Sequence, residues 1–156
     1  MKKKIAILGS TGSIGKSTID IIRKDKKNFD IVLLTTNQNY KEILKQIKEF
    51  RVRNIVINNN NHYLNLKRRF KNNKINIFNN IDEFNYKFNS KIDFTMSAIT
   101  GLEGLKPTLD LIKFSKKIAI ANKESIICAW NLIQKKIKKY KTKFIPIDSE
   151  HFSIWS

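Results

Sequence analysis

The stretch KIAILGSTGSIGKST, residues 4–18, decides the fold that we expect of this chain. Its apolar run, residues 5–8, predicts a short buried strand, and the isoleucines at helical spacing from residue 14 onward predict a helix. Between them stand Gly9, Gly12 and Gly15. Glycine lets the backbone turn sharply and approach a ligand closely, and the free N–H groups at a helix start attract an anion. The stretch therefore predicts a phosphate-binding element.

This turn has three possible interpretations, namely two nucleotide-binding motifs and a turn without a ligand. The dinucleotide fingerprint is G-x-G-x-x-G after a strand, and here the glycines are spaced Gly9-x-x-Gly12-x-x-Gly15, one residue longer at the first gap. The P-loop is G-x-x-x-x-G-K-[ST]. The sequence GKS at residues 15–17 matches its second half, but Ser10 stands where its first glycine belongs. A tight turn without a ligand is the third possibility. The place of the turn, between the first strand and a helix, favours the dinucleotide interpretation.

The end of the second predicted strand, residues 31–36, distinguishes NAD from NADP. NAD sites usually place Asp or Glu there to hold the ribose 2′-hydroxyl. This strand runs into TTNQN, residues 35–39, which contains no carboxylate, and Lys41 is close in sequence. A 2′-phosphate would not be repelled at this place, so the sequence favours NADP over NAD.

Composition and charge limit the class of protein. The 156 residues suffice for one domain with a substantial core. The formal net charge is +18, from 31 Lys and Arg against 13 Asp and Glu. The lysines are spread along the whole chain among asparagine and isoleucine, as A+T-rich codon usage produces, and they form no arginine-rich block. We therefore expect no specific nucleic-acid partner, although non-specific attraction to phosphate follows from the charge.

The single cysteine and the lengths of the apolar segments indicate the kind of compartment in which the chain is expected. A single cysteine, Cys128, excludes an internal disulfide and a cysteine-built metal site. We expect it in the core because it lies in the apolar run at residues 126–129. The start MKKKIAILGS has an apolar run too short for a signal peptide, and no apolar stretch reaches the ~20 residues that span a bilayer. We therefore expect a soluble, cytoplasmic chain without a membrane partner.

Strand-like and helix-like segments alternate along the chain, which indicates parallel strands with right-handed crossover helices. The sequence therefore predicts an α/β, Rossmann-like doubly wound fold, a mostly parallel sheet with helices on both faces and ligands at the carboxyl ends of the strands. Residues 82–88 are ambiguous, and Pro107 is expected to begin the regular part of its helix. Strands are expected at residues 5–8, 30–36, 54–57, 75–78, 92–97, 118–121 and 144–147, and later helices at residues 40–50, 61–70, 101–114 and 124–140.

Two carboxylates follow the last predicted strand, in the sequence DSEH at residues 148–151. In extended backbone, residues i and i+2 point the same way, so Asp148 and Glu150 would face one spot. Such a pair suits Mg²⁺ or Mn²⁺, with substrate, water or further residues completing a shell of about six oxygens. A solvated acidic turn is the structural alternative. His151 is expected at the surface or in a hydrogen bond rather than on a metal.

The sequence NKES, residues 122–125, follows the strand expected at residues 118–121. Asn122 is a good helix N-cap with Ser125 three residues beyond it, and Glu124 in the first turn suits the helix dipole. These structural roles do not explain Lys123, a cation at the positive end of a helix. A cation in this position is unfavourable, because the helix dipole repels it. An anion nearby would offset that cost, so Lys123 is a candidate ligand for a substrate oxygen or phosphate.

The motifs LGSTGSIGKSTID, AITGLEG, ANKES and IPIDSEH, in this order and spacing, resemble those of 1-deoxy-D-xylulose 5-phosphate reductoisomerase along the whole chain. The resemblance implies an enzyme that converts 1-deoxy-D-xylulose 5-phosphate, a small phosphorylated sugar, to 2-C-methyl-D-erythritol 4-phosphate in isoprenoid precursor synthesis. A divalent metal would assist the rearrangement of the carbon skeleton, and NADPH would then deliver a hydride to the resulting aldehyde. It also implies a homodimer for the full-length family.

The resemblance assigns roles residue by residue. Lys123 matches a substrate-binding and catalytic position. Asp148 and Glu150 match metal ligands with a catalytic role, and Ser149, like Glu150, matches a substrate contact. The family's cofactor contacts correspond to the pyrophosphate-binding turn Thr11, Gly12, Ser13 and Ile14, and to Asn39, Asn122 and Glu124.

Two departures from the family pattern shape our expectations. Asn37 and Gln38 stand where the family commonly has Gly-Lys, which alters the grip on the 2′-phosphate. Family members also continue beyond DSEH into a connective domain with a third carboxylate ligand and a helical C-terminal domain. We therefore expect residues 1–156 to form an NADP-binding domain, as a fragment, a truncated product or an isolated domain, that binds nucleotide weakly and does not turn over substrate. The first alternative hypothesis is an inactive nucleotide-binding remnant. The second, which the sequence favours less, is a P-loop NTPase.

Overall fold

The computed structural model describes residues 1–147, which form a seven-stranded sheet with parallel pairing throughout. The strand order is β4-β3-β2-β1-β5-β6-β7. The chain thus starts in the middle of the sheet, runs to one edge, and returns past β1 to the other edge. This reversal is typical of doubly wound dinucleotide-binding sheets, so the predicted Rossmann-like fold is confirmed. The strands are β1 (Lys3–Leu8), β2 (Phe29–Thr36), β3 (Asn54–Ile57), β4 (Asn76–Phe78), β5 (Ile92–Ser97), β6 (Ser115–Ile120) and β7 (Lys143–Pro146).

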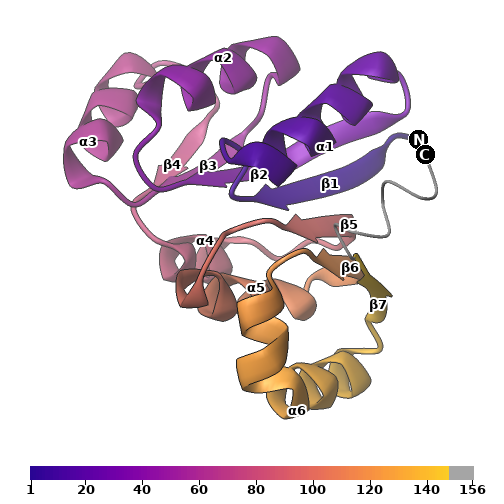
Figure 1. Cartoon of the computed structure of the whole chain (residues 1–156). Helices are drawn as coiled ribbons and strands as arrows, with labels where there is room; N and C mark the ends of the chain where they lie inside the picture. Colours follow the sequence, from indigo (N-terminus) through magenta and orange to yellow (C-terminus); the bar gives the residue numbers. More distant parts are fainter. Residues whose placement is uncertain (148–156) are drawn as a thin grey trace.

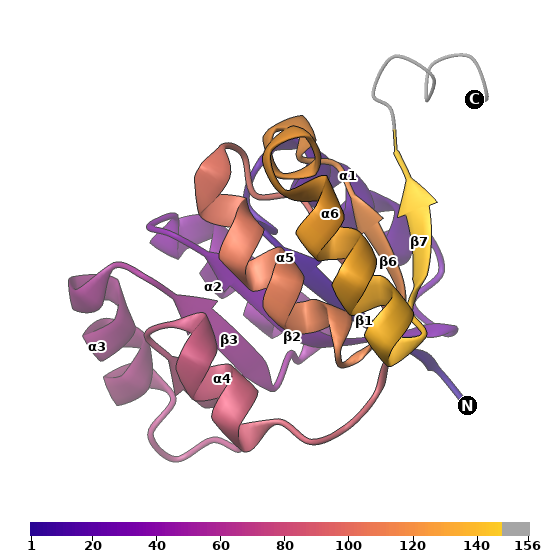
Figure 2. The same cartoon turned by 90° about the horizontal axis from the view of Figure 1, so that it is seen from below.

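Helices cover both faces of the sheet, as predicted. One face carries α1 (Ser13–Lys24), α2 (Tyr40–Phe50) and α3 (Asn60–Arg69), which lie above the sheet in Figure 1. The opposite face carries α4 (Ile81–Lys87), the short 3₁₀ turn η1 (Leu102–Gly104), α5 (Leu105–Ile112) and α6 (Lys123–Tyr140), which cross the near side of the sheet in Figure 2.

Apolar side chains from alternate positions of each strand bury the two faces. In β1, Ile5 and Ile7 pack on the side of α1, α2 and α3, whereas Ala6 and Leu8 pack on the side of α4 and α5. All four side chains are buried. A parallel sheet that is covered on both faces produces such continuous apolar strands, which is why residues 5–8 were recognisable as a strand from the sequence.

Most predicted elements are confirmed, with shifts at their ends. Residues 81–87 fold as α4, so the ambiguous segment is a helix. Helix α5 begins at Leu105, two residues before the predicted start at Pro107, which lies in its first turn as predicted. Because none of the first N–H groups of a helix has an intrahelical acceptor, proline fits this position too. Strand β6 begins at Ser115, before the predicted start at residue 118.

The prediction that Cys128 lies in the core is wrong, because its side chain is exposed. Helix α6 is interrupted at Ala129, whose φ of −136° and ψ of 25° are not helical. Ile127, just before the break, is 80% exposed, whereas Ile133 after the break is fully buried in the cluster with β6. Ile126 is partly buried against the same cluster, so the exposed residues of the run are Ile127 and Cys128.

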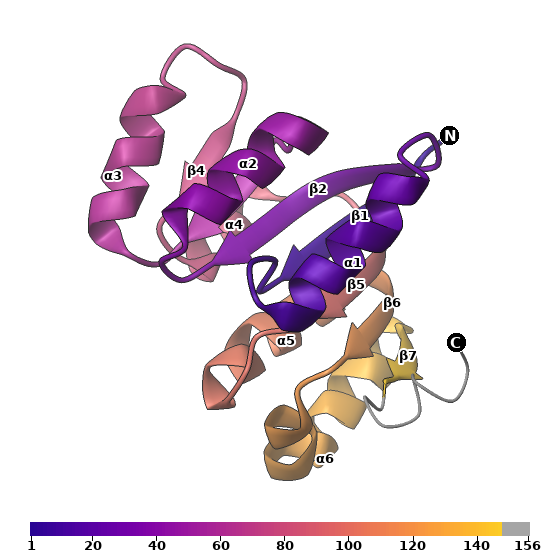
Figure 3. The same cartoon turned by 45° about the horizontal axis from the view of Figure 1, so that its top comes forward.

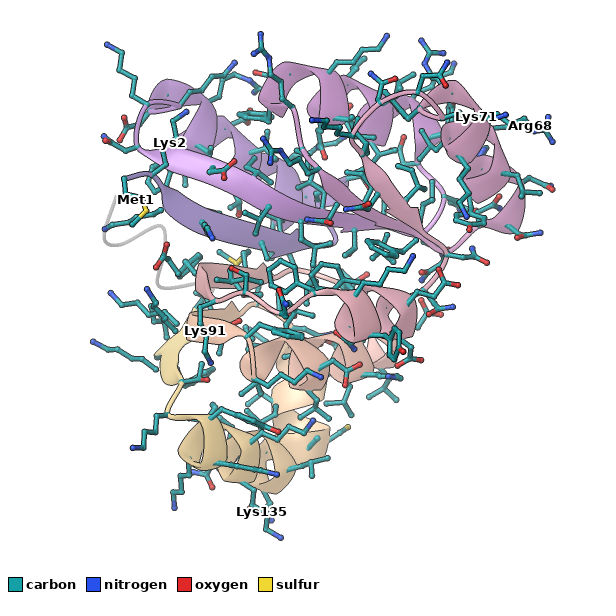
Figure 4. The ribbon with its side chains drawn as sticks, turned by 180° about the vertical axis from the view of Figure 1, so that it is seen from behind. Met1, Lys2, Arg68, Lys71, Lys91 and Lys135 are labelled. Carbon is teal, nitrogen blue, oxygen red and sulfur yellow. The ribbon has the colours of Figure 1, made fainter. Side chains whose placement is uncertain are left out.

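Basic side chains lie on several parts of the surface. Figure 4 shows Arg68 and Lys71 close together at the end of α3, and Lys2, Lys91 and Lys135 elsewhere on the molecule. Within residues 1–147, no helix combines the length and the apolar character that crossing a membrane requires.

Candidate functional site

The turn after β1 and the first turn of α1 each contain a glycine that a side chain would disrupt. Gly9 has a φ of +78°, and a Cβ on it would lie 3.0 Å from the backbone of Ala98 and Ile99 at the end of β5. A Cβ on Gly15 would lie 2.1 Å from the carbonyl oxygen of Gly9, so α1 starts in direct contact with the turn. Gly12 differs, because the nearest atom to its Cβ would be 3.7 Å away. The space beside Gly12 is therefore open to a ligand.

The start of α1 leaves backbone donors available. Its N-terminal residue Gly12 has no side chain to cap it, its first turn contains no acidic residue, and its first helical bond runs from Lys16 N–H to the Gly12 carbonyl at 2.9 Å. The N–H groups of Ser13, Ile14 and Gly15 thus have no intrahelical acceptor, and the helix dipole makes this end attractive to an anion. By contrast, an asparagine side chain accepts a hydrogen bond at the start of α2, α3, α4 and α6, from Asn39, Asn59, Asn80 and Asn122 respectively.

A cavity of about 660 Å³ lies beside this turn, along the carboxyl ends of the strands. Small-molecule sites usually have volumes of about 300–1,000 Å³. In Figure 3 the arrowheads of β1 and β6 point to the side on which the β1–α1 turn and the start of α6 lie. The lining includes all four residues of the predicted pyrophosphate turn, Thr11, Gly12, Ser13 and Ile14, and also Thr35, Thr36, Asn37, Asn58, Asn79, Asn80, Ile99, Thr100, Glu103 and Lys106.

The end of β2 presents hydroxyl and amide groups to this cavity. The Gly9 N–H donates to Thr35 Oγ1 at 2.9 Å, and Thr11 Oγ1 lies 2.7 Å from Thr36 Oγ1. These bonds tie the glycine turn to β2. The Asn37 carbonyl accepts a hydrogen bond from the Asn59 N–H at 2.9 Å, which joins the loops after β2 and β3. The loop after β2 is therefore held in place without a carboxylate in residues 35–39.

Asn39, a predicted cofactor contact, lies at the start of α2. Its Oδ1 accepts a hydrogen bond from the Glu42 N–H at 3.2 Å, so it caps that helix. It is not among the residues that line the 660 Å³ cavity, although the neighbouring Asn37 is.

Asn122 joins three segments at the start of α6. It is only 4% exposed, and its Oδ1 accepts a hydrogen bond from the Ser125 N–H at 3.1 Å, which confirms the predicted N-cap. Its Nδ2 donates to the carbonyl oxygens of Ile99, at 2.7 Å, and of Gly101. A Cβ on Gly104 would lie 2.7 Å from that Nδ2. Both amide hydrogens are therefore used within the protein. Only the Oδ1 atom and the backbone of Asn122 can still form a hydrogen bond with a cofactor.

Lys123 and Glu124 follow on the exposed first turn of α6, at the same edge of the sheet as the glycine turn. The structure thus gathers the four residues of the predicted pyrophosphate turn in one cavity and places the other described candidates at the starts of α2 and α6. The remaining candidates, Asp148, Ser149, Glu150 and His151, lie outside the described residues. Within residues 1–147, no group of three or more His, Cys, Asp or Glu side chains is arranged to hold a metal ion.

Several cavity residues were absent from the sequence-based prediction. Asn79 follows β4, and its Nδ2 donates to the carbonyl oxygens of Ile57 and Asn58, which shapes the wall of the cavity beyond β3. Lys106 on α5 pairs with Asp110 at 2.7 Å and with Asp82 at 2.6 Å, and these two bonds raise the pKa of its ammonium group. An asparagine directly after a strand is the signal that would have located Asn58 and Asn79, but the segment of residues 54–89 is rich in asparagine as a whole.

Comparisons with known proteins agree with this geometry. The profile of the 1-deoxy-D-xylulose 5-phosphate reductoisomerase family matches residues 5–130. The 1-deoxy-D-xylulose 5-phosphate reductoisomerase of Pelagibacter ubique is 61% identical over 156 residues, which cover 99% of this chain and 40% of the relative. The enzyme of Zymomonas mobilis in complex with NADPH superposes with a TM-score of 0.86 at 33% identity, over 97% of this chain and 40% of that one.

A structure of DOX-P reductoisomerase in complex with NADPH, fosmidomycin and magnesium superposes with a TM-score of 0.85 at 35% identity, over 96% of this chain and 37% of that one. The chain therefore spans about 40% of the length of the relatives it matches. The family profile covers both the glycine turn and the ANKES motif, so the resemblance drawn from those motifs is confirmed. This chain belongs to the 1-deoxy-D-xylulose 5-phosphate reductoisomerase family.

Proposed function

We propose that this chain binds NADPH, with the pyrophosphate at the start of α1. The observation that carries the proposal is the uncapped first turn of α1, whose N–H groups lie beside a cavity lined by Thr11, Gly12, Ser13 and Ile14. A dinucleotide pyrophosphate needs such donors and the close backbone approach that Gly12 permits. The similarity to a reductoisomerase crystallised with NADPH supports the same cofactor here.

The preference for NADPH over NADH rests on the end of β2. Residues 35–39 present hydroxyl and amide groups, and Lys41 lies exposed in the first turn of α2. A 2′-phosphate bound at this loop would meet no negative charge within it. The ammonium group of Lys41 would stand one turn away. Because Asn37 and Gln38 replace the Gly-Lys pair common in the family, we propose that the discrimination against NADH is modest.

We propose the family reaction for the complete enzyme, with this chain as its NADPH-binding part. Asp148 and Glu150, outside the described residues, would hold Mg²⁺ or Mn²⁺, which supplies charge stabilisation while the carbon skeleton rearranges. Ser149 and Lys123 would bind the phosphorylated substrate, and Asn39, Asn122 and Glu124 the cofactor. A cytoplasmic location and a homodimer belong to the same proposal.

Calorimetric titration of the purified chain with NADPH, NADH and ATP tests the cofactor. We expect NADPH to bind, NADH to bind more weakly, and ATP to give the weakest response. Ser13→Asp places a carboxylate in the first turn of α1, where it stabilises the helix but repels a pyrophosphate. It should therefore weaken NADPH binding by about tenfold or more without lowering the melting temperature. Ser17→Asp, one turn further along α1, is the matched control. Stronger binding of ATP than of NADPH would instead support the P-loop hypothesis.

Turnover is tested separately, with 1-deoxy-D-xylulose 5-phosphate, NADPH and Mg²⁺. Since the chain spans about 40% of its relatives, we expect no oxidation of NADPH by the chain alone. Rapid oxidation would contradict that expectation. Binding of NADPH without turnover agrees equally with an inactive remnant, so turnover by a longer form is the measurement that distinguishes the two.

A further inference from the structure

Strand β4 forms one edge of the sheet, and within residues 1–147 no strand pairs with its outer side. On its inner side it pairs with β3, with Asn54 beside Asn76. The Asn76 N–H donates to the Arg53 carbonyl oxygen at 2.7 Å, so the backbone of Asn76 faces β3. Because successive residues of a strand direct their backbone groups to alternate sides, the N–H and carbonyl groups of Ile77 face the open edge. Such an edge is a template for pairing with another chain.

A cavity of about 520 Å³ lies at this open edge, and we call it the β4-edge groove. Helices α3 and α4 contact β4 from opposite faces of the sheet, and Figure 2 shows them together at one side of the molecule. The apolar lining includes Leu64, which is 40% exposed, and the half-buried side chains of Phe70 and Ile75. An open backbone edge beside side-chain pockets is the geometry in which proteins recognise an extended peptide.

Four exposed basic side chains line the β4-edge groove. They come from α3, from the turn after it and from the end of α4, and they are Lys67, Arg68, Lys71 and Lys87. Within residues 1–147, none of the four forms an ion pair with a carboxylate. Glu83 also lines the groove, but its carboxylate already accepts hydrogen bonds from the Asn79 N–H at 3.2 Å and from Asn80 Nδ2 at 3.4 Å. The groove is therefore complementary to an acidic occupant.

The backbone edge and the apolar lining indicate which acidic occupant fits. A polypeptide can form hydrogen bonds with the free backbone groups of Ile77 and place apolar side chains on Leu64 and Phe70, whereas a polynucleotide cannot extend the sheet. A second copy of this chain is disfavoured. Two β4 edges that met would bring the same four cations together, and like charges at an interface oppose association.

We propose that the β4-edge groove binds an extended acidic segment of a partner protein, which adds to the sheet as a further strand beside Ile77. Acidic side chains of the partner would face the four basic residues, and its apolar side chains would cover Leu64, Phe70 and Ile75. Because β4 has only 3 residues, few backbone bonds are available, and the binding is weak and sensitive to salt. The β4-edge groove shares no lining residue with the cavity at the glycine turn, so the proposal does not depend on NADPH.

Fluorescence anisotropy of a labelled peptide of alternating glutamate and valine tests this on the purified chain. The double variant Arg68→Glu with Lys71→Glu, at two side chains that lie close together in Figure 4, should weaken peptide binding by about tenfold or more. The matched control is Lys91→Glu with Lys135→Glu, the same change of charge at exposed residues elsewhere. It should weaken binding by no more than about threefold. A peptide with the same side chains but methylated backbone nitrogens cannot donate to the edge, and it should bind about tenfold or more weakly.

Several results would overturn the proposal. They are absence of peptide binding at low salt, equal binding of the methylated peptide, equal losses in the two double variants, and tighter binding of single-stranded RNA than of the peptide. The amide shifts of ¹⁵N-labelled chain report the place of binding. We expect the peptide to change the shifts at residues 75–78 and to leave those at residues 9–15, where we propose NADPH, unchanged. The reverse pattern would also contradict the proposal.

The same titration in a longer protein shows whether the edge is open there too. The 156 residues of this chain replace their counterpart in the Pelagibacter ubique relative, which is 61% identical to them. We expect the chimaera to bind the peptide as tightly as the chain alone does. Loss of binding in the chimaera would overturn the proposal, because the enzyme's own polypeptide would then cover the edge.

Discussion

At the scale of single residues, the three glycines of the first turn have different tasks. Gly9 is required by its positive φ, and Gly15 by its contact with the Gly9 carbonyl oxygen. Gly12 has an ordinary φ of −79° and no close neighbour for a Cβ. The packing of the protein therefore does not require a glycine here, and we propose that the ligand does.

Substitution of these glycines by alanine separates folding from binding. Gly15→Ala forces a methyl group against backbone, so we expect the free energy of unfolding to fall by about 3 kcal/mol. Gly12→Ala should change it by about 1 kcal/mol or less, yet weaken NADPH binding about tenfold, because the methyl group occupies the space of the pyrophosphate. Urea denaturation and calorimetry measure the two effects. Unchanged NADPH affinity in Gly12→Ala would contradict this assignment.

The carboxylate of Glu49 links α2 to α1 and makes stability depend on pH. The Arg23 guanidinium bonds it at 2.6 Å, and this bond, with that of Lys26, lowers the pKa of Glu49 from 4.5 to about 2. A lowered folded-state pKa means that the stabilisation is complete above the unfolded-state value of 4.5 and is lost as the pH falls toward 2.

Glu49→Gln should therefore cost stability at pH 7, and this cost should shrink as the pH falls from 4.5 toward 2. The Arg23 side chain is 43% exposed, so solvent screening limits the expected loss to about 1 kcal/mol or less. The difference in unfolding free energy between wild type and variant is measured by urea denaturation at several pH values. Asp30→Asn, at an exposed carboxylate of β2, is the control. A difference that grows on acidification would have the wrong sign and would contradict the argument.

At the scale of elements, asparagine caps anchor four of the helices, but they are not equivalent. Asn59 only caps α3, with its Oδ1 accepting from the His62 N–H at 3.1 Å. Asn122 caps α6 and also holds the loop after β5 through Ile99 and Gly101. Removing Asn122 therefore leaves two carbonyl oxygens without their donor, in addition to an uncapped helix.

Asn59→Ala should cost about 1 kcal/mol of stability, and Asn122→Ala about 2–3 kcal/mol. Thermal and urea unfolding of the two variants give the comparison directly. Equal costs would show that the bonds from Asn122 to the loop after β5 contribute nothing beyond the cap.

The elements that were predictable from the sequence are those with an unambiguous local pattern. The apolar run of β1 and the amphipathic helix α2 were located because burial leaves a direct trace in the residue order. The start of β6 was missed because Lys116 and Lys117 are exposed and hide the strand before Ile118. Cys128 was misplaced because a run of apolar residues does not reveal which of its members face solvent, as Ile127 and Cys128 do.

At the scale of the whole molecule, the order of the strands brings the candidate site together. The ends of β1, β2 and β5 meet beside the first turn of α1, so Thr11, Thr36 and Ile99 share one cavity although they are distant in sequence. The glycine turn was predictable because its chemistry is local. The contributions of Asn58 and Asn79 were not, since they depend on which strands are neighbours in the sheet.

The same arrangement leaves part of one face of the sheet uncovered within residues 1–147. A groove beside α1 has the apolar side chains of Phe94, Met96 and Ile145 among its lining residues. We therefore expect the chain alone to bind an apolar fluorescent dye such as ANS in its folded state, and Met96→Glu to reduce that fluorescence while the circular dichroism is unchanged. Equal dye binding by Met96→Glu would place the exposed apolar surface elsewhere.

The central claim is that the first turn of α1 receives the pyrophosphate of NADPH. It is tested most directly by the amide chemical shifts of ¹⁵N-labelled chain during titration with NADPH. We predict the largest changes at residues 9–15, with further changes at residues 36–39. If these amides keep their shifts while NADPH is saturating, or if the changes are confined to the groove at residues 93–96 and 145–147, the claim is contradicted.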